Sequence, residues 1–213
     1  MPNKVSVSIL GADCANLGAA VNRIDKSAAD ALHLDIMDGT LVSNISFGVP
    51  TIRALRSYTK KEFDVHLMLQ TPLQFIQGIC EAGADVIAVH PEAYGFEEAL
   101  EDIVKRGKKA ALALSPDTGL DAAAPYLHNL ARVLILGVPP GFGAQEFIPE
   151  IAEKIYDLAD MIGSLPVEIA VDGGMNEQTA RLARESGAKI ICAGSFVTSH
   201  PNWEERIDIL KNA

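Results

Sequence analysis

The stretch Glu81-Ala82-Gly83-Ala84-Asp85-Val86-Ile87 has the pattern of a helix that ends at a glycine and is followed at once by a strand. A glycine in this place suits the left-handed residue that often closes a helix. Much later the chain repeats the pattern as Glu185-Ser186-Gly187-Ala188-Lys189-Ile190-Ile191. The repetition indicates successive β–α units within one fold, and it is too sparse to indicate a solenoid.

Short runs rich in Val, Ile and Leu alternate with longer segments of helical period along the whole chain. This alternation is typical of an α/β protein with a parallel sheet. The runs predict eight strands, at residues 5–9, 32–36, 63–68, 86–90, 110–114, 133–136, 167–171 and 190–193. Helices are predicted at residues 71–82, 96–106, 149–162, 177–186 and 203–211, and glycines 83, 107, 163 and 187 stand where helices would end.

The length of 213 residues fits one large core, in either a barrel or a doubly wound sheet. Eight β–α units in this length close most naturally into a (β/α)8 TIM barrel, whose site lies just after the strands. No linker, low-complexity tract or block of charge interrupts the series. We therefore expect a single barrel domain over residues 1–213.

The composition limits the class of partner. A net charge of −10 argues against nucleic acid, although backbone N–H groups at helix starts can still bind a small anion. The chain has no long apolar run, no leader and no lipidation signal, so we expect a soluble cytoplasmic protein without a membrane partner. The odd number of cysteines favours buried thiols over disulfides for Cys14, Cys80 and Cys192.

Polar residues alternate with apolar ones in two of the predicted strands. In Leu32-His33-Leu34-Asp35-Ile36-Met37-Asp38-Gly39, the period of a strand puts His33, Asp35 and Met37 on one face. The next strand repeats this design with Asp64, His66 and Met68. In a barrel these faces point inward, where a His or Asp without a partner costs several kcal/mol.

A metal ion would give these residues a partner. Two imidazoles and two carboxylates converge from three strand ends, the third strand ending in Val171-Asp172-Gly173-Gly174. Such nitrogen and oxygen ligands suit zinc, iron, manganese or cobalt. Any one His could be a core residue, but the three patterns together favour a metal site. His90, at the end of another predicted strand, either lines this pocket or pairs with Glu92.

Three glycine-rich turns also follow predicted strands. They are Pro140-Gly141-Phe142-Gly143-Ala144-Gln145, Asp172-Gly173-Gly174 and Ala193-Gly194-Ser195. Glycine lets the backbone approach an anion, and the loops after the last two strands of this architecture are a frequent phosphate site. Each turn alone is unremarkable, so the prediction of a phosphate site depends on their common placement.

These motifs, in this order, resemble the ribulose-phosphate 3-epimerase family over essentially the whole chain. The resemblance also includes Ser8-Ile9-Leu10 with Ala12-Asp13, and Phe147-Ile148-Pro149. It implies a metal held by His33, Asp35, His66 and Asp172. It further implies substrate contacts from Ser8, His66, Gly143, Gly173, Gly174, Gly194 and Ser195, and a homo-oligomeric state.

The activity implied is inversion of carbon 3 of a ketose phosphate, with D-ribulose 5-phosphate converted to D-xylulose 5-phosphate. Asp35 and Asp172 would serve as base and acid on opposite faces of the substrate, and one divalent ion would stabilise the enediolate between them. No organic cofactor is needed.

The chain departs from the family pattern in loops that cover the sugar, at Ser43, Ser115, Leu136, Pro139 and Ala144. These departures leave open allulose 6-phosphate or another ketose phosphate as the substrate. Decarboxylase or aldol chemistry is disfavoured, because the predicted strand that contains His33 and Asp35 has no Asp-x-Lys arrangement to supply a cationic proton donor. A sugar-phosphate-binding regulatory barrel without activity is the remaining alternative.

Overall fold

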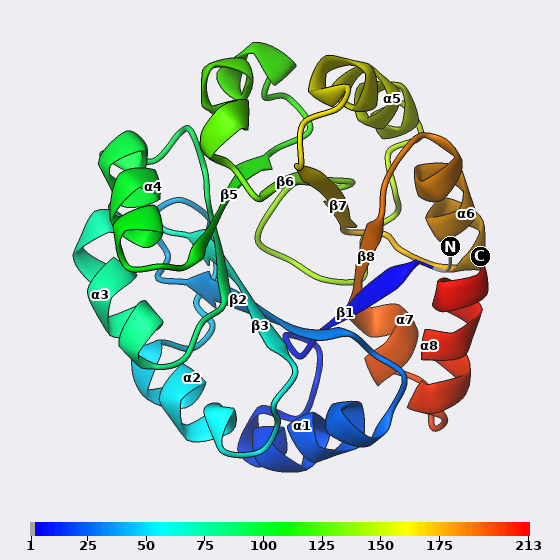
Figure 1. The fold of residues 1–213 in the computed structure, drawn as a ribbon. Helices are drawn as coiled ribbons and strands as arrows, with labels where there is room; N and C mark the ends of the chain where they lie inside the picture. The colour runs from blue at the N-terminus through cyan, green and yellow to red at the C-terminus, as the bar shows by residue number, and fades with distance from the viewer. Residues whose placement is uncertain (1–2) are drawn as a thin grey trace.

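The computed structural model describes residues 3–213, and eight parallel strands close into a barrel in chain order (Figure 1). Met1 and Pro2, which belong to the predicted domain 1–213, lie outside the described residues. The prediction of a (β/α)8 TIM barrel is confirmed. The strands are β1 (Lys4–Ser8), β2 (Ala31–Met37), β3 (Glu62–Met68), β4 (Val86–Val89), β5 (Lys109–Leu114), β6 (Arg132–Leu136), β7 (Glu168–Asp172) and β8 (Ile190–Ala193).

Helices form an outer ring around the strands (Figure 1). They are α1 (Leu17–Lys26), α2 (Val49–Arg56), α3 (Leu73–Glu81), α4 (Phe96–Lys105), α5 (Ile151–Ile162), α6 (Glu177–Glu185), α7 (Ser195–Thr198) and α8 (Trp203–Asn212). Short 3-10 segments lie at Cys14–Asn16, Leu120–Ala122 and Ala124–Asn129. The last two replace an α-helix between β5 and β6, where Pro125 occupies the start of the second segment.

The predicted helix ends are confirmed by backbone geometry. Gly83, Gly107, Gly163 and Gly187 all have positive φ angles, from 53° at Gly163 to 117° at Gly187. Only glycine adopts this conformation without steric cost, so each residue lets the chain turn from its helix toward the next strand.

The two faces of the strands pack against different neighbours. Leu32, Leu34 and Ile36 of β2 belong to the large core between strands and helices, as the alternating pattern predicts. A separate cluster of mostly small residues fills part of the barrel interior from β4 to β8, including Ala88, Ala111, Ala113, Ala170 and Cys192. Polar side chains occupy the interior side of β1, β2 and β3.

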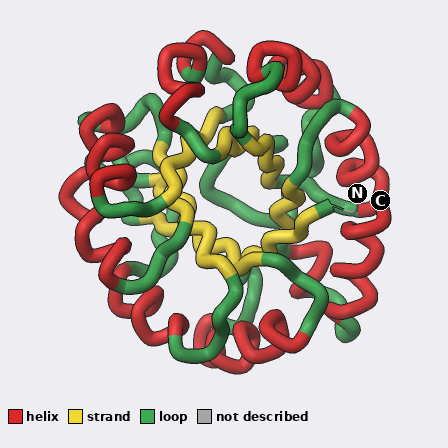
Figure 2. Tube along the Cα trace, in the orientation of Figure 1, coloured by secondary structure: helices red, strands yellow, loops and turns green. Residues whose placement is uncertain are grey.

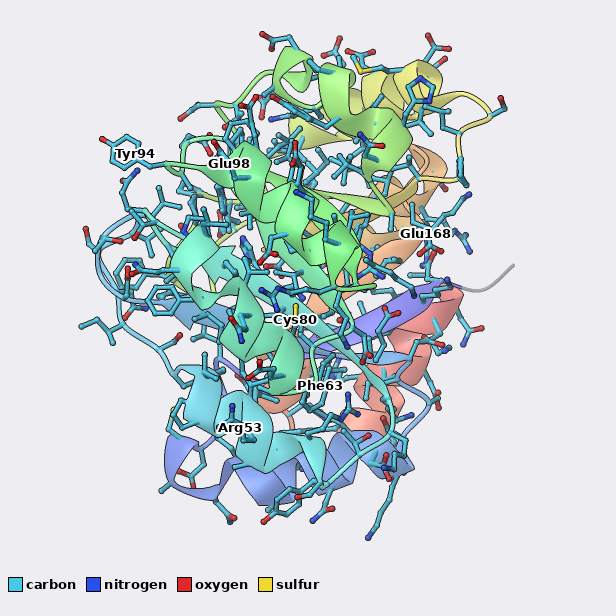
Figure 3. All side chains as sticks on the ribbon, turned by 60° about the vertical axis from the view of Figure 1, so that its left-hand side comes forward. Arg53, Phe63, Cys80, Tyr94, Glu98 and Glu168 are labelled. Carbon is cyan, nitrogen blue, oxygen red and sulfur yellow. The ribbon has the colours of Figure 1, made fainter. Side chains whose placement is uncertain are left out.

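The two ends of the barrel differ in what lies there. The segment between β6 and α5 crosses the central opening of the strand ring (Figure 2), and the Asn44 side chain donates to the Gly141 carbonyl within it at 2.6 Å. Figure 3 separates the two ends by labelled residues: Tyr94, which follows β4, projects outward on the left, and Glu168, which opens β7, lies on the right.

Among residues 3–213, no helix combines the length and the apolar character needed to cross a bilayer. The expectation of buried thiols holds for Cys192 and partly for Cys80, but it is wrong for Cys14, which is exposed beside the short 3-10 segment it begins. All three cysteines are free thiols.

Candidate active site

A cavity of about 260 Å³ opens at the carboxyl ends of the strands. Its lining includes Ser8, Asp35, His66, Gly143, Asp172, Gly173, Gly174, Gly194 and Ser195. The structure therefore brings every predicted site residue except His33 into the wall of one cavity. His33 lies just beneath it, with a completely buried side chain.

The parallel register of β2 and β3 places the polar residues in two layers. Asp35 is the register partner of His66, and His33 is the partner of Asp64. In the upper layer His66 Nδ1 lies 3.2 Å from Asp35 Oδ1, and Ser8 Oγ donates to Asp35 Oδ2 at 2.7 Å. Ser8 therefore holds one oxygen of Asp35 while the other faces the imidazoles.

One buried nitrogen in this group has no hydrogen-bond partner. His33 Nε2 lies 3.3 Å from Asp35 Oδ1 and 3.8 Å from Asp172 Oδ2, yet it forms no hydrogen bond. His33, Asp35, His66 and Asp172 each offer a ligand atom, and these atoms lie within 4.8 Å of one another. A buried polar atom without a partner is costly. The donor set and its spacing thus fit a divalent metal ion.

The two carboxyl groups of the site have opposite proton affinities. Burial acts to raise the pKa of Asp35, but the neighbouring imidazoles of His33 and His66 outweigh it and hold that pKa far below its ordinary range. Burial raises the pKa of Asp172 to about 7, and the neighbouring charge of Asp35 adds to this effect. Near neutral pH, the Asp35 carboxylate is therefore ionised, whereas Asp172 can hold a proton.

Backbone geometry at the far wall of the cavity requires glycine. Gly173 and Gly174 have φ angles of 96° and 68°. A Cβ on Gly174 would lie 2.5 Å from the backbone nitrogen of Phe147, and one on Gly173 would lie 2.5 Å from the Val138 side chain. Gly143 differs, since a Cβ there would meet nothing within 4 Å.

A charged cluster lies below the cavity. Asp64 accepts from Ser6 Oγ at 3.0 Å and faces His33 Nδ1 at 3.0 Å. The guanidinium of Arg132 lies 2.8 Å from Asp64 Oδ1 and also pairs with Glu62 at 3.0 Å. Burial acts to raise the pKa of Asp64, but Arg132 and His33 outweigh it and hold that pKa well below its usual range.

Ser6 and Arg132 were not among the predicted site residues. The available signal was the period of two, because Arg132 precedes Leu134 and Leu136 on the inward side of β6. His33, Asp64 and Cys192 also offer closely spaced ligand atoms. The positive charge of Arg132 beside Asp64 makes this lower group a poor site for a cation.

Of the two alternatives left open by the sequence, His90 pairs with Glu92 and is not among the residues that line the cavity. Its Nε2 lies 2.8 Å from His66 Nε2, and its Nδ1 lies 3.4 Å from Glu92 Oε2. Burial lowers the pKa of His90 despite the nearby Glu92. His90 therefore contacts the back of a residue that lines the cavity.

Comparisons with known proteins agree with this geometry. The model of the ribulose-phosphate 3 epimerase family matches residues 4–198. The chain is 40% identical over 214 residues to the ribulose-phosphate 3-epimerase of Synechocystis sp., covering 98% of this chain and 93% of that protein. It is 37% identical to the ribulose-phosphate 3-epimerase of Bacillus subtilis, covering 99% of both.

Among solved structures, the crystal structure of KGPDC from Streptococcus mutans superposes with a TM-score of 0.71, at 17% identity, covering 100% of this chain and 97% of that one. A likeness at this identity shows the fold alone. The family match and the curated relatives go further, and with them the chain belongs to the ribulose-phosphate 3-epimerase family, a family of isomerases that act on carbohydrates.

Proposed function

We propose that the protein inverts carbon 3 of a ketose phosphate, with D-ribulose 5-phosphate as substrate and D-xylulose 5-phosphate as product. The observation that carries the proposal is that Asp35 and Asp172 line one cavity, at 3.3 and 3.8 Å from the same His33 nitrogen, with pKa values displaced in opposite directions. Two titratable groups separated in this way are suited to act as base and acid at the same pH. The names of the curated relatives support this choice of substrate.

In the proposed reaction, the Asp35 carboxylate removes the proton from carbon 3 on one face of the substrate. An enediolate forms, and protonated Asp172 donates its proton to carbon 3 from the opposite face. The configuration is inverted and the two carboxyl groups exchange protonation states. The reverse reaction uses the same residues with their roles exchanged, and Ser8 orients Asp35 through its hydrogen bond at 2.7 Å.

One divalent ion, zinc, iron, manganese or cobalt, would be held by His33, Asp35, His66 and Asp172. When bound, such an ion supplies Lewis-acid stabilisation of negative charge on the substrate oxygens, worth several kcal/mol. No organic cofactor takes part in the proposed reaction.

The phosphate group would lie against the backbone of Gly143, Gly173, Gly174, Gly194 and Ser195. Glycines permit close approach of backbone N–H groups to an anion, which needs no basic side chain. We further propose a single domain over residues 1–213, a homo-oligomeric state and a cytoplasmic location, with neither nucleic acid nor membrane as a partner.

The test is to incubate the purified protein with each candidate metal in deuterated water, and to follow carbon 3 by NMR. Ribulose 5-phosphate and allulose 6-phosphate are compared. Deuterium entry with inversion of the five-carbon substrate is expected. Preference for the six-carbon substrate would transfer the assignment to that epimerase activity, and no exchange on either would leave a sugar-phosphate-binding barrel without this activity.

A further inference from the structure

Residues 139–146 form a cover segment across the mouth of the cavity. The segment leaves the barrel after β6 and reaches the loop after β2, and these two strands stand on opposite sides of the eight-stranded ring (Figure 2). Six of its residues line the cavity: Pro139, Pro140, Gly141, Phe142, Gly143 and Ala144. The position of the cover segment therefore decides the shape of the outer cavity wall.

The two ends of the cover segment are fixed on the β7 side of the barrel. Just before the segment, the Gly137 N–H donates to the Asp172 carbonyl at 2.6 Å, and just after it the Ile148 N–H donates to the Gly137 carbonyl at 2.9 Å. Within the segment, the Gln145 amide donates to two backbone carbonyls, each at 2.8 Å. The segment is thus braced internally and would move as one unit about its ends.

The far side of the cover segment is held at Gly141. This residue is buried, although the three residues that follow it are exposed. A Cβ on Gly141 would lie 3.1 Å from the Val42 Cβ, so the two backbones pack closely there. The Gly141 carbonyl also accepts from Asn44 Nδ2 at 2.6 Å. Among residues 3–213, no other hydrogen bond ties the cover segment to the loop after β2.

The orientation of the Asn44 side chain is fixed by two different partners. Its Oδ1 accepts from the Ile45 backbone N–H at 2.9 Å, while its Nδ2 donates to the Gly141 carbonyl. A backbone N–H only donates and a carbonyl only accepts, so exchanging the amide oxygen and nitrogen would lose both bonds. Asn44 is therefore the donor of this contact, and an aspartate of the same shape could not replace it.

We propose that Asn44 is a positioning residue, whose hydrogen bond to Gly141 holds the cover segment over the cavity and so keeps Gly143 against the substrate phosphate. The phosphate part rests on the proposed function, whereas the holding of the segment rests on the contacts alone. A Cβ on Gly143 would meet nothing within 4 Å, so the place of Gly143 depends on the segment that carries it.

Two substitutions separate the loss of the donor from a change of charge. Asn44→Asp removes the donor and keeps the acceptor for the Ile45 N–H, but it also adds a negative charge. Ser43→Asp is the matched control, because Ser43 is exposed and does not line the cavity. It adds the same charge to the same loop while the bond from Asn44 is kept.

The first measurement is limited digestion with chymotrypsin in the absence of substrate. Phe142 in the cover segment is 56% exposed, and Tyr94 in the loop after β4 is 71% exposed and serves as the internal reference. A protease cuts a locally opened chain, so its rate follows the fraction of protein in which the segment has left its place.

Asn44→Asp should be cut after Phe142 about fivefold faster than wild type, the ratio that corresponds to roughly 1 kcal/mol for one net hydrogen bond. Cleavage after Tyr94 should stay unchanged, and Ser43→Asp should behave as wild type at both sites. An unchanged rate at Phe142, an equal acceleration at both sites, or the same acceleration in Ser43→Asp would overturn the inference.

The second measurement is steady-state kinetics with D-ribulose 5-phosphate. A phosphate contact shared by substrate and transition state affects KM and leaves kcat unchanged. Asn44→Asp should raise KM about 3–10-fold above that of Ser43→Asp, with kcat within about twofold of wild type. Equal KM values in the two variants contradict the positioning role and leave the proposed function intact. Wild-type protein without activity removes the proposed function, and the digestion still decides whether Asn44 holds the cover segment.

Discussion

Asp35 and Asp172 face the same imidazole nitrogen, His33 Nε2, from distances of 3.3 and 3.8 Å, and their pKa values are displaced in opposite directions. The difference arises from contacts. Asp35 accepts a hydrogen bond from Ser8 and lies beside the imidazoles of His33 and His66, whereas Asp172 is largely buried with a neighbouring negative charge. In the proposed mechanism, this difference would prepare Asp35 as the base and Asp172 as the acid before substrate arrives.

Asp35→Asn and Asp172→Asn should each abolish inversion of the substrate while the barrel remains folded. An amide can neither take nor give the proton, and losing a general acid or base typically costs about 10²–10⁴-fold. The rate is measured by NMR and the fold by circular dichroism. Asp38→Asn is the matched control, since Asp38 is exposed and its carboxylate accepts hydrogen bonds from the backbone N–H and the hydroxyl of Thr40. Near-normal inversion in either variant would remove that residue from the mechanism.

The stability of the metal-free protein should depend on Asp172 through pH. Its folded-state pKa of about 7 lies above the ordinary value of 3.8, so its contribution is full below pH 3.8 and is lost as pH rises through 7. The side chain is 20% exposed, which moderates the effect of burial. Relative to Asp172→Asn, wild type should lose about 1–2 kcal/mol of unfolding free energy between pH 5 and pH 8.

Urea unfolding with chelator present, at both pH values, measures this difference. The Asn variant carries the same remaining ionisable groups, so their contributions largely cancel. A difference between wild type and variant that does not change with pH would show that Asp172 ionises in the folded protein as it does in the unfolded chain.

Arg132→Leu should destabilise the protein by about 3–5 kcal/mol, because it leaves the buried Asp64 carboxylate without its cation. Adding Asp64→Asn should recover part of this loss, since the neutral amide tolerates burial better. A double-mutant cycle from urea unfolding gives the coupling between the two positions. Additive effects of the two substitutions would mean that the ion pair contributes nothing of its own.

Gly174→Ala should destabilise the protein by more than about 1 kcal/mol, because φ is 68° and the added Cβ would meet the backbone of Phe147. Gly143→Ala should change stability by no more than about 0.5 kcal/mol, since the Cβ would have open space. Because Gly143 is proposed to contact the phosphate, Gly143→Ala should raise KM even though it leaves stability nearly unchanged. Thermal unfolding and steady-state kinetics check both, and equal destabilisation would contradict the backbone argument.

The sequence predicted the strands closely because runs of Val, Ile and Leu are distinct from the longer helical segments. Each strand end was within one residue of its predicted place. The connection between β5 and β6 was harder to predict. Its two 3-10 segments are only 3 and 6 residues long, too short to show the repeating apolar pattern of a helix. Alternation also placed His33, Asp35 and His66 inward, and the structure has them there.

Contacts between strands could not be predicted in the same way. Arg132 lay one residue before the predicted strand, and its pairing with Asp64 depends on the closure of the whole barrel. The separation of the pKa values of Asp35 and Asp172 depends on burial and on distances of a few ångströms, neither of which appears in the chain as a local pattern.

The direct pairing of β1 with β8 also bears on how the chain folds during synthesis. Lys4 is the register partner of Ile190, so the first strand must wait for almost the entire chain before it gains its second neighbour. Until β8 leaves the ribosome, the growing sheet has two open edges whose N–H and C=O groups can pair with other chains. Chaperones that shield strand edges should therefore matter most for nascent chains that end before residue 190.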